Sequence, residues 1–354
     1  MAGVDIGEDG GEYSLMDDPT IFVIVIALVF TSVPVTVAII QEIQRRKMRA
    51  AAVRQGKPLR QPLAQPESKH RLNGRYELKA PAYKQGGMAN IWLARDRTNG
   101  RKCIIKTPRR GTTMDNVYLD KLRQEAEFLK KLQHPNIVTY LDDFYYKGEF
   151  HLVLELVTGE TIMSSSPRSS AGEQKVVTWA GQALEALAYV HAAGIVHRDV
   201  NPKNIMLSGN GGIKLIDFGT AKSLENMKKD TVRTDPFTQI ANKGFDIPEL
   251  FMGGESDQRC DLCGLAQTCI YLLTLRQPND LCNELIHTSW PRSYAEAGTV
   301  ADYLISAGFS RRTSRCLAQA IMFSPGSRFA SAVAMRSALL ASSPDEVKAV
   351  EVSK

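Results

Sequence analysis

The distribution of apolar and polar residues sets the beginning of the chain apart from the rest. Residues 21–40 (IFVIVIALVFTSVPVTVAII) form a run of 20 residues without a single charge. A helix over this run would be about 30 Å long, which is the thickness of the hydrocarbon core of a bilayer. Pro34 can kink such a helix without preventing it from spanning. The pattern therefore predicts a transmembrane helix over residues 21–40.

The charges on the two sides of this run are opposite. Residues 1–20 carry six acidic residues and no lysine or arginine, whereas residues 41–60 carry seven basic residues against Glu42 alone. The positive-inside rule then places the N-terminus outside and the rest of the chain in the cytoplasm. A signal peptide is the competing interpretation, but its shorter apolar region would follow positive charge. We expect a single-pass membrane protein whose basic segment contacts anionic lipid headgroups.

After a linker with three prolines (residues 57–70), the pattern becomes that of a globular domain. Strand-like apolar segments lie around residues 91–94, 103–106 and 150–156, and one amphipathic helix is expected over 118–132, before His134-Pro135. Helical periodicity then dominates. The helices that it predicts are 175–192, 260–275, 300–307 and 311–323.

These patterns predict an α+β globular domain with a strand-rich part followed by a helical part. A binding site is expected where the two parts meet. The expected segments are an acidic extracytoplasmic N-terminus (1–20), the transmembrane helix (21–40), a basic juxtamembrane segment with a linker (41–74), the globular domain (75–340) and a C-terminal tail (341–354).

Composition adds little to this picture. The net charge of +6 is modest, and we expect no nucleic-acid partner. Six cysteines are scattered through the globular domain. Cys260 and Cys263 have the C-x-x-C spacing, but neither a second pair nor a nearby pair of histidines completes a zinc site. We expect reduced, mostly buried thiols.

Two short motifs carry the candidate chemistry. Residues 197–204 (HRDVNPKN) are followed by residues 217–219 (DFG). Phosphoryl transfer needs a carboxylate that orients the attacking hydroxyl and oxygen ligands for the Mg²⁺ that bridges the phosphates. Asp199 can supply the first, and Asn204 and Asp217 the second.

The residues between these motifs predict how they meet. Residues 205–207 and 213–216 are apolar runs on either side of the glycine-rich turn 209–212, which favours a β-hairpin. Such a hairpin would bring Asp217 beside Asn204. Either tripeptide alone would be a weak signal, whereas both in order, with an asparagine between them, are a strong one.

With these motifs in order, the chain resembles the eukaryotic-type (Hanks-type) protein kinase domain, of the Ser/Thr class also found in bacteria and archaea. The resemblance covers roughly residues 75–340. It implies a bilobal kinase fold, with a small β-rich N-lobe and a larger helical C-lobe. It also implies transfer of the γ-phosphoryl of ATP to hydroxyls of protein substrates with Mg²⁺, or alternatively Mn²⁺, by an enzyme that phosphorylates itself.

The resemblance assigns roles position by position. Lys106 matches the strand lysine that holds the α- and β-phosphates, and Glu125, nine residues before His134, matches the helix glutamate that pairs with it. Asp199 matches the catalytic aspartate, while Asn204 and Asp217 match the metal ligands. The other positions that match ATP-binding residues of the family are Gly86, Gly87, Ile91, Ile104, Leu154 (the gatekeeper), Glu155, Val157 and Met206.

Three further matches are structural and two are regulatory. Asp261 matches the acid that anchors the catalytic loop, and Glu249 ends the activation segment and pairs with Arg328. Arg198 matches the arginine that binds a phosphate on the activation segment. Thr238, eleven residues before Glu249, stands where the family carries that phosphate.

The sequence also departs from the family. The glycine-rich loop, residues 84–89 (KQGGMA), lacks the first and third glycines, and Ile104 replaces a small alanine above adenine. Asn201 replaces the lysine that contacts the γ-phosphate. We interpret its charge as moved to Lys203, immediately before the metal ligand. This shift leaves tyrosine or dual specificity open beside Ser/Thr, and Asn242 replaces the threonine that Ser/Thr kinases usually hold near the catalytic aspartate.

Three other functions compete with this interpretation. A pseudokinase scaffold would explain Asn201 and the altered loop, but the five main catalytic positions are all present. A small-molecule phosphotransferase shares part of the site, yet Arg198, Asp261 and Arg328 favour a protein kinase. A sensory receptor is disfavoured because about 20 residues outside the membrane cannot form a ligand-binding domain. We expect the helix to be a tether and a candidate homodimerisation element.

Overall fold

The computed structural model describes residues 71–85, 89–109, 111, 115–165, 171–209, 211–229, 244–252, 256–286 and 297–341. The chain divides into two compact units, Met1–Pro66 and Glu67–Lys354, and the described residues belong to the second. Several predicted features lie outside the described residues: the transmembrane helix, the basic segment, Gly86, Gly87 and Thr238. Within the described ranges, no helix is long and apolar enough to cross a membrane.

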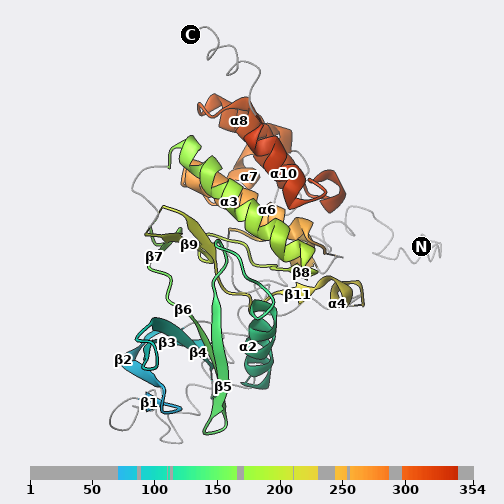
Figure 1. Cartoon of the computed structure of the whole chain (residues 1–354). Coiled ribbons are helices and arrows are strands. Elements are labelled where there is room, and N and C mark those ends of the chain that lie inside the picture. The colour runs from blue at the N-terminus through green and yellow to red at the C-terminus, as the bar shows by residue number, and fades with distance from the viewer. Residues whose placement is uncertain are drawn as a thin grey trace, which may run out of the picture. The chain divides into compact units, whose positions relative to one another are not determined.

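Residues 71–155 of the second unit form an antiparallel sheet with one helix between its strands, drawn in blue to green in Figure 1. Its six strands follow the order β1-β2-β3-β4-β6-β5. The strands predicted around residues 91–94, 103–106 and 150–156 are confirmed as β3, β4 and β6. The bounds are β1 (Arg71–Leu72), β2 (Tyr76–Gln85), β3 (Ala89–Asp96), β4 (Lys102–Pro108), β5 (Tyr140–Tyr146) and β6 (Glu149–Glu155).

The two faces of this sheet pack differently. One face forms a small core that includes Tyr76, Cys103 and Ile105. On the other face lies helix α2 (Asp115–Leu129), which contacts β4, β5 and β6. Since side chains alternate along a strand, Ile105 and Lys106 point to opposite faces of β4. The alternation therefore turns Lys106 toward α2.

Helix α2 begins and ends three residues earlier than the predicted range 118–132. After Leu129 the chain tightens, because Lys131 N–H donates to Phe128 O and Leu132 N–H to Leu129 O, a spacing of three residues. The apolar periodicity continues through this turn, since Leu132 is buried. Periodicity alone therefore overestimated the helix at its C-terminal end.

The rest of the unit is mainly helical (yellow-green to red in Figure 1). Helices α3 and α6 contact each other, and α9 and α10 pack on α6. Thirteen of the sixteen residues of α6 are buried, as its largely uncharged sequence indicates. The helices are α3 (Glu173–Ala192), α4 (Leu224–Lys229), α5 (Pro248–Met252), α6 (Arg259–Thr274), α7 (Pro278–Ile286), α8 (Ala297–Ser306), α9 (Arg311–Ala320) and α10 (Ala332–Leu340), with a 3₁₀ turn at η2 (Pro325–Ser327).

Short strands position the two motifs. The predicted hairpin is confirmed, because β9 (Ile205–Ser208) pairs antiparallel with β10 (Ile213–Leu215), and β7 (Gly159–Thr161) completes this sheet. A second small pair joins β8 (Ile195–Val196) to β11 (Lys222–Ser223). The HRD motif thus follows β8, and the DFG motif lies between β10 and β11. The α+β fold with a strand-rich N-lobe and a helical C-lobe is as predicted.

All six cysteines are buried and none forms a disulfide. Burial raises the pKa of the Cys263 and Cys269 thiols to about 12, so both are protonated at neutral pH. This agrees with the expectation of reduced, buried thiols.

Candidate active site

Lys106 connects the two lobes through ion pairs. Its Nζ lies 2.7 Å from Glu125 Oε1 on α2 and 3.1 Å from Asp217 Oδ1 of the DFG motif. Lys106 and Glu125 are buried, whereas the Asp217 side chain is 47% exposed. Burial alone would lower the pKa of Lys106, but the charges of Asp217 and Glu125 outweigh it and raise that pKa. The ammonium group is therefore charged at any physiological pH.

Glu125 also fixes the DFG backbone. Its Oε1 accepts a hydrogen bond from Phe218 N–H at 3.2 Å, and the buried Phe218 ring packs 4.5 Å from the His197 ring, centroid to centroid. Asp217 adopts φ +67°, a left-handed conformation that a non-glycine residue holds only when its surroundings stabilise it. The charge of Lys106 lowers the pKa of the Asp217 carboxyl. This carboxylate is therefore ionised and fixed in place.

The catalytic loop holds Asp199 with two asparagines. Asn201 Nδ2 donates to Asp199 Oδ1 at 2.7 Å, and Asn204 Nδ2 donates to Asp199 Oδ2 at 2.7 Å. Both amides also donate to the Asp199 carbonyl oxygen, at 3.0 and 2.9 Å. Sequence reasoning assigned Asn204 to the metal and interpreted Asn201 as a charge moved to Lys203, and it missed both amide contacts with the carboxylate.

Asn204 and Asp217 are neighbours, as the hairpin argument expected. Ile216 N–H donates to Asn204 O at 2.9 Å, so the residue before Asp217 is bonded to Asn204. The Asn204 amide nitrogen is used by Asp199, which leaves its oxygen as the possible ligand. One carboxylate and one amide oxygen fit Mg²⁺, which binds through one or two carboxylates together with substrate phosphates. No group of three or more acidic, histidine or cysteine side chains suited to a metal occurs among the described residues.

Asp261, at the start of α6, anchors the backbone of the catalytic loop. This fully buried carboxylate accepts hydrogen bonds from the backbone N–H groups of His197 (2.9 Å) and Arg198 (2.7 Å), and it contacts His191 Nε2 at 2.8 Å. Burial alone would raise the pKa of Asp261, but His191 and the other donors lower it overall. Gly264 allows close contact here, because a Cβ at that position would lie 2.3 Å from Val200 O.

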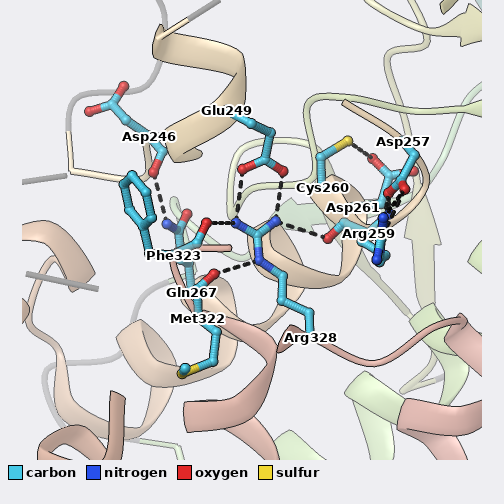
Figure 2. A network of polar contacts seen from close by, with 10 residues as sticks. All are labelled: Asp246, Glu249, Asp257, Arg259, Cys260, Asp261, Gln267, Met322, Phe323 and Arg328. Carbon is cyan, nitrogen blue, oxygen red and sulfur yellow. Dashed lines mark hydrogen bonds and ion pairs between the residues drawn. The ribbon is translucent and has the colours of Figure 1, made fainter. Parts of the chain in front are cut away.

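Glu249 and Arg328 form a second buried ion pair, shown in Figure 2. Arg328 Nη1 lies 2.6 Å from Glu249 Oε1, and Nη2 lies 2.8 Å from Oε2. The same guanidinium also donates to the backbone carbonyl oxygens of Met322, Phe323 and Arg259. The pair expected from the resemblance is thus in contact, and it joins α5 to the turn before α10.

Several side chains assigned to ATP binding lie on β4, the strand of Lys106, or on the strands paired with it. Ile91 pairs with Lys106 across β3 and β4, and Ile104 pairs with the buried Leu154 across β4 and β6. Val157 packs, like Ile104, against the large core. Met206 on β9 is half-buried.

Glu155, at the end of β6, is one of the positions that match ATP-binding residues of the family. Its side chain forms an ion pair with Lys214 Nζ on β10 at 2.6 Å and accepts hydrogen bonds from Thr139. Lys214 also donates to Ile137 O at 3.1 Å. Sequence reasoning missed this link between β6 and the strand that leads to Asp217, because nothing in the local pattern pairs residues 59 positions apart.

The remaining residues of the loop differ in burial. Lys203 is exposed, and its backbone N–H donates to Asn201 Oδ1 at 2.9 Å. Arg198 has φ +66° and is only 7% exposed, and within the described ranges its Nε and Nη1 atoms have no hydrogen-bond partner. A buried guanidinium with open donors is suited to binding an anion. Thr238, its expected partner once phosphorylated, lies outside the described residues.

Comparison with known proteins agrees with this geometry. The chain is 35% identical over 218 residues to a probable serine/threonine-protein kinase of Streptomyces coelicolor, which covers 60% of this chain and 32% of that protein. It is 32% identical over 211 residues to serine/threonine-protein kinase PrkC of Bacillus subtilis, covering 59% and 32%. With serine/threonine-protein kinase PknA of Mycobacterium tuberculosis the identity is 35% over 204 residues, covering 55% and 45%.

The chain therefore spans about a third to under half of the length of these relatives. The profile of the protein kinase domain matches residues 84–295, which is more than half of the chain. This match includes Lys106, Glu125, Asp199 and Asp217, which the structure brings together from both lobes. The chain belongs to the protein kinase domain family.

Proposed function

We propose that the chain is a membrane-anchored Ser/Thr protein kinase that uses ATP and Mg²⁺, with Mn²⁺ as an alternative, and phosphorylates itself as well as protein substrates. The observation that carries the proposal is Lys106, which pairs with both Glu125 and Asp217. Two of the relatives named above are serine/threonine-protein kinases and the third is a probable one, which supports the choice of hydroxyl.

The residues divide the work of phosphoryl transfer. Lys106 holds the α- and β-phosphates, and Glu125 keeps Lys106 directed at them. Asp199 orients the attacking hydroxyl and accepts its proton. Asn204 and Asp217 hold Mg²⁺, which when bound neutralises charge on the transferring group. Lys203, exposed beside Asn204, supplies the positive charge near the γ-phosphate that the neutral Asn201 lacks.

The adenine ring binds among Ile91, Ile104, Leu154, Val157 and Met206. Ile91, Ile104, Leu154 and Met206 lie on β3, β4, β6 and β9, and the backbone at Glu155 and Val157 supplies the polar contacts. Gly86 and Gly87 bring the backbone of the glycine-rich loop close to the phosphates, because glycine has no side chain to obstruct the approach.

The test is phosphoryl transfer by the full chain in detergent or vesicles. Purified protein is incubated with γ-labelled ATP, Mg²⁺ and a generic protein substrate, and the labelled amino acids are identified. We expect phosphoserine and phosphothreonine. Labelled phosphotyrosine would indicate dual specificity, and nucleotide binding without transfer would favour the alternative function of a pseudokinase scaffold.

The membrane proposal rests on residues 21–40 and on the charges that flank them. The acidic N-terminus lies outside and the kinase domain lies in the cytoplasm, with the basic segment on anionic lipid. Tethering raises the local concentration of kinase domains, which favours homodimers and phosphorylation in trans. Protease added to intact cells should spare the kinase domain, and its digestion would overturn this orientation.

The regulatory proposal joins Arg198 to Thr238. A phosphate on Thr238 carries about −1.5 to −2 charges and can form one to three charge-assisted hydrogen bonds with a guanidinium. The open donors of the buried Arg198 support this partner. We expect mass spectrometry of active protein to find phosphate on Thr238, and Thr238→Ala to lower activity. An unphosphorylated segment in fully active protein would exclude this switch.

A further inference from the structure

Asn201 stands where the family carries a lysine that contacts phosphate, but its side chain contacts Asp199 and Lys203 of its own loop. The residue is only 2% exposed. An asparagine amide has two N–H donors, and here Nδ2 contacts Asp199 twice, at the carboxylate Oδ1 and at the carbonyl oxygen. Its own Oδ1 accepts from Lys203 N–H at 2.9 Å. The amide is therefore fully used within the loop and has no donor left for a phosphate.

The contact with Asn201 completes a pair of restraints on the same carboxylate. Asn204 holds Oδ2 of Asp199 and Asn201 holds Oδ1, each at 2.7 Å. One donor alone would let the carboxylate rotate about the bond that joins it to Cβ, since the terminal torsion of aspartate is broad. Two donors on different oxygens fix that torsion. A carboxylate offers about four acceptor sites, two of which these amides occupy.

We infer that Asn201 is a positioning residue for Asp199: its amide fixes the carboxylate orientation in which Asp199 receives the substrate hydroxyl. The inference rests on the proposed kinase activity and adds a residue to it. Loss of the donor should reduce the fraction of Asp199 in the reactive orientation, which lowers kcat. It should not weaken nucleotide binding, because Asn201 has no donor that faces the triphosphate.

The test compares three variants of the full chain in the transfer assay. Asn201→Ala removes the donor. Asn201→Asp is nearly isosteric and keeps an acceptor for Lys203 N–H, but it places a second carboxylate against Asp199. Asn99→Ala is the matched control, because Asn99 Nδ2 also donates to a carboxylate, Asp96 Oδ2 at 3.2 Å, in the exposed turn between β3 and β4.

We expect kcat to fall about 10- to 100-fold in Asn201→Ala, which is what the loss of a hydrogen bond to a charged group produces, and further in Asn201→Asp. The KM and the equilibrium Kd for Mg·ATP should change less than threefold in both. Asn99→Ala should match the wild type. Circular dichroism melting of each variant shows whether the fold is intact under assay conditions.

The outcomes separate this inference from the proposed function. If the wild type transfers phosphate and folded Asn201→Ala retains its kcat, Asn201 has no positioning role while the kinase proposal stands. If instead the Kd for Mg·ATP rises as much as kcat falls, Asn201 acts on the nucleotide and the inference is wrong. Absence of transfer by the wild type overturns both. Should Asn201→Ala fail to fold, Asn201→Asp decides, since wild-type kcat in that variant would contradict the inference.

Discussion

Two ion clusters of this molecule each place a basic side chain against carboxylates, but they differ in how many of their hydrogen-bonding groups have partners. Around Arg328, one cation meets one carboxylate, and the five N–H donors of the guanidinium are matched by five bonds to Glu249 and to backbone carbonyls. Around Lys106, one cation meets two carboxylates, so the cluster carries a net negative charge. We call the Arg328 cluster closed, because its cation is matched by the bonds around it, and the Lys106 cluster open, because it has one more carboxylate than cation.

Exposure shows the same difference. The side chains of Arg328 and Glu249 are 0% and 6% exposed, whereas Asp217 is 47% exposed at the end of its cluster. A cluster with excess negative charge and an accessible carboxylate can accept a cation, and one without them cannot. Changes in the open cluster should therefore remove activity, while changes in the closed one should mainly remove stability.

The largest effect is expected at Asp199, beside the open cluster. Asp199→Asn keeps the size of the side chain but removes the carboxylate that we propose accepts the hydroxyl proton. Since general base catalysis contributes about 10²- to 10⁴-fold, transfer should fall by that factor. Thermal melting should show the fold unchanged. A variant with wild-type activity would show that Asp199 does not have the role proposed for it.

The next effect is expected in the closed cluster, on stability. Arg328→Ala leaves Glu249 buried without a counter-charge, and breaking such a pair costs about 3 to 5 kcal/mol of the free energy of unfolding. Urea denaturation measures this loss. The control is Arg336→Ala, whose exposed ion pair with Glu185 at 3.4 Å should contribute less than about 1 kcal/mol. Equal losses in the two variants would contradict the distinction between closed and exposed pairs.

Lys106→Ala tests the open cluster directly. It removes the cation that pairs with Glu125 and Asp217, and kcat/KM should fall about 10²- to 10³-fold, as for loss of one preorganised electrostatic contact at a reacting group. Stability should fall too, since Glu125 stays buried without its partner. Transfer assays and melting on the same sample compare the two effects. Loss of stability without loss of activity would make Lys106 a structural residue.

The contacts within these clusters could be predicted from the sequence to different extents. The strand alternation at Lys106 and the hairpin before Asp217 follow from local patterns, so both could be predicted from the chain alone. The pairings of Lys106 with Glu125 and of Glu249 with Arg328 were predicted only through the family resemblance. The amide contacts of Asn201 and the Glu155–Lys214 pair were not predicted, because they depend on side-chain directions and distant register that a linear pattern does not contain.

The smallest effect concerns Glu155, whose pair with Lys214 is intermediate between the two clusters, with side chains 14% and 18% exposed. Burial alone would raise the pKa of Glu155, but hydrogen bonds from Lys214 and Thr139 outweigh it and lower the pKa overall. A carboxyl whose pKa is lower in the folded than in the unfolded state stabilises the fold when ionised. This stabilisation is fully present above the unfolded pKa of about 4.3 and is lost as the pH falls through the folded value.

Glu155→Gln keeps the shape of the side chain but removes the charge, so we expect a loss of about 1 kcal/mol at pH 7, the difference between a charged and a neutral hydrogen bond. The difference between the wild type and the variant should shrink as the pH falls below about 4.3, because the unfolded wild-type chain then takes up a proton at Glu155, and the folded chain does so at still lower pH. Urea unfolding at pH 7 and pH 4 measures both values. Glu160→Gln, exposed on β7, is the control and should match the wild type at each pH. The contradicting result would be a free energy of unfolding that rises in the wild type relative to Glu155→Gln as the pH falls. The ionised Glu155 would then destabilise the fold, and its pair with Lys214 would be unfavourable.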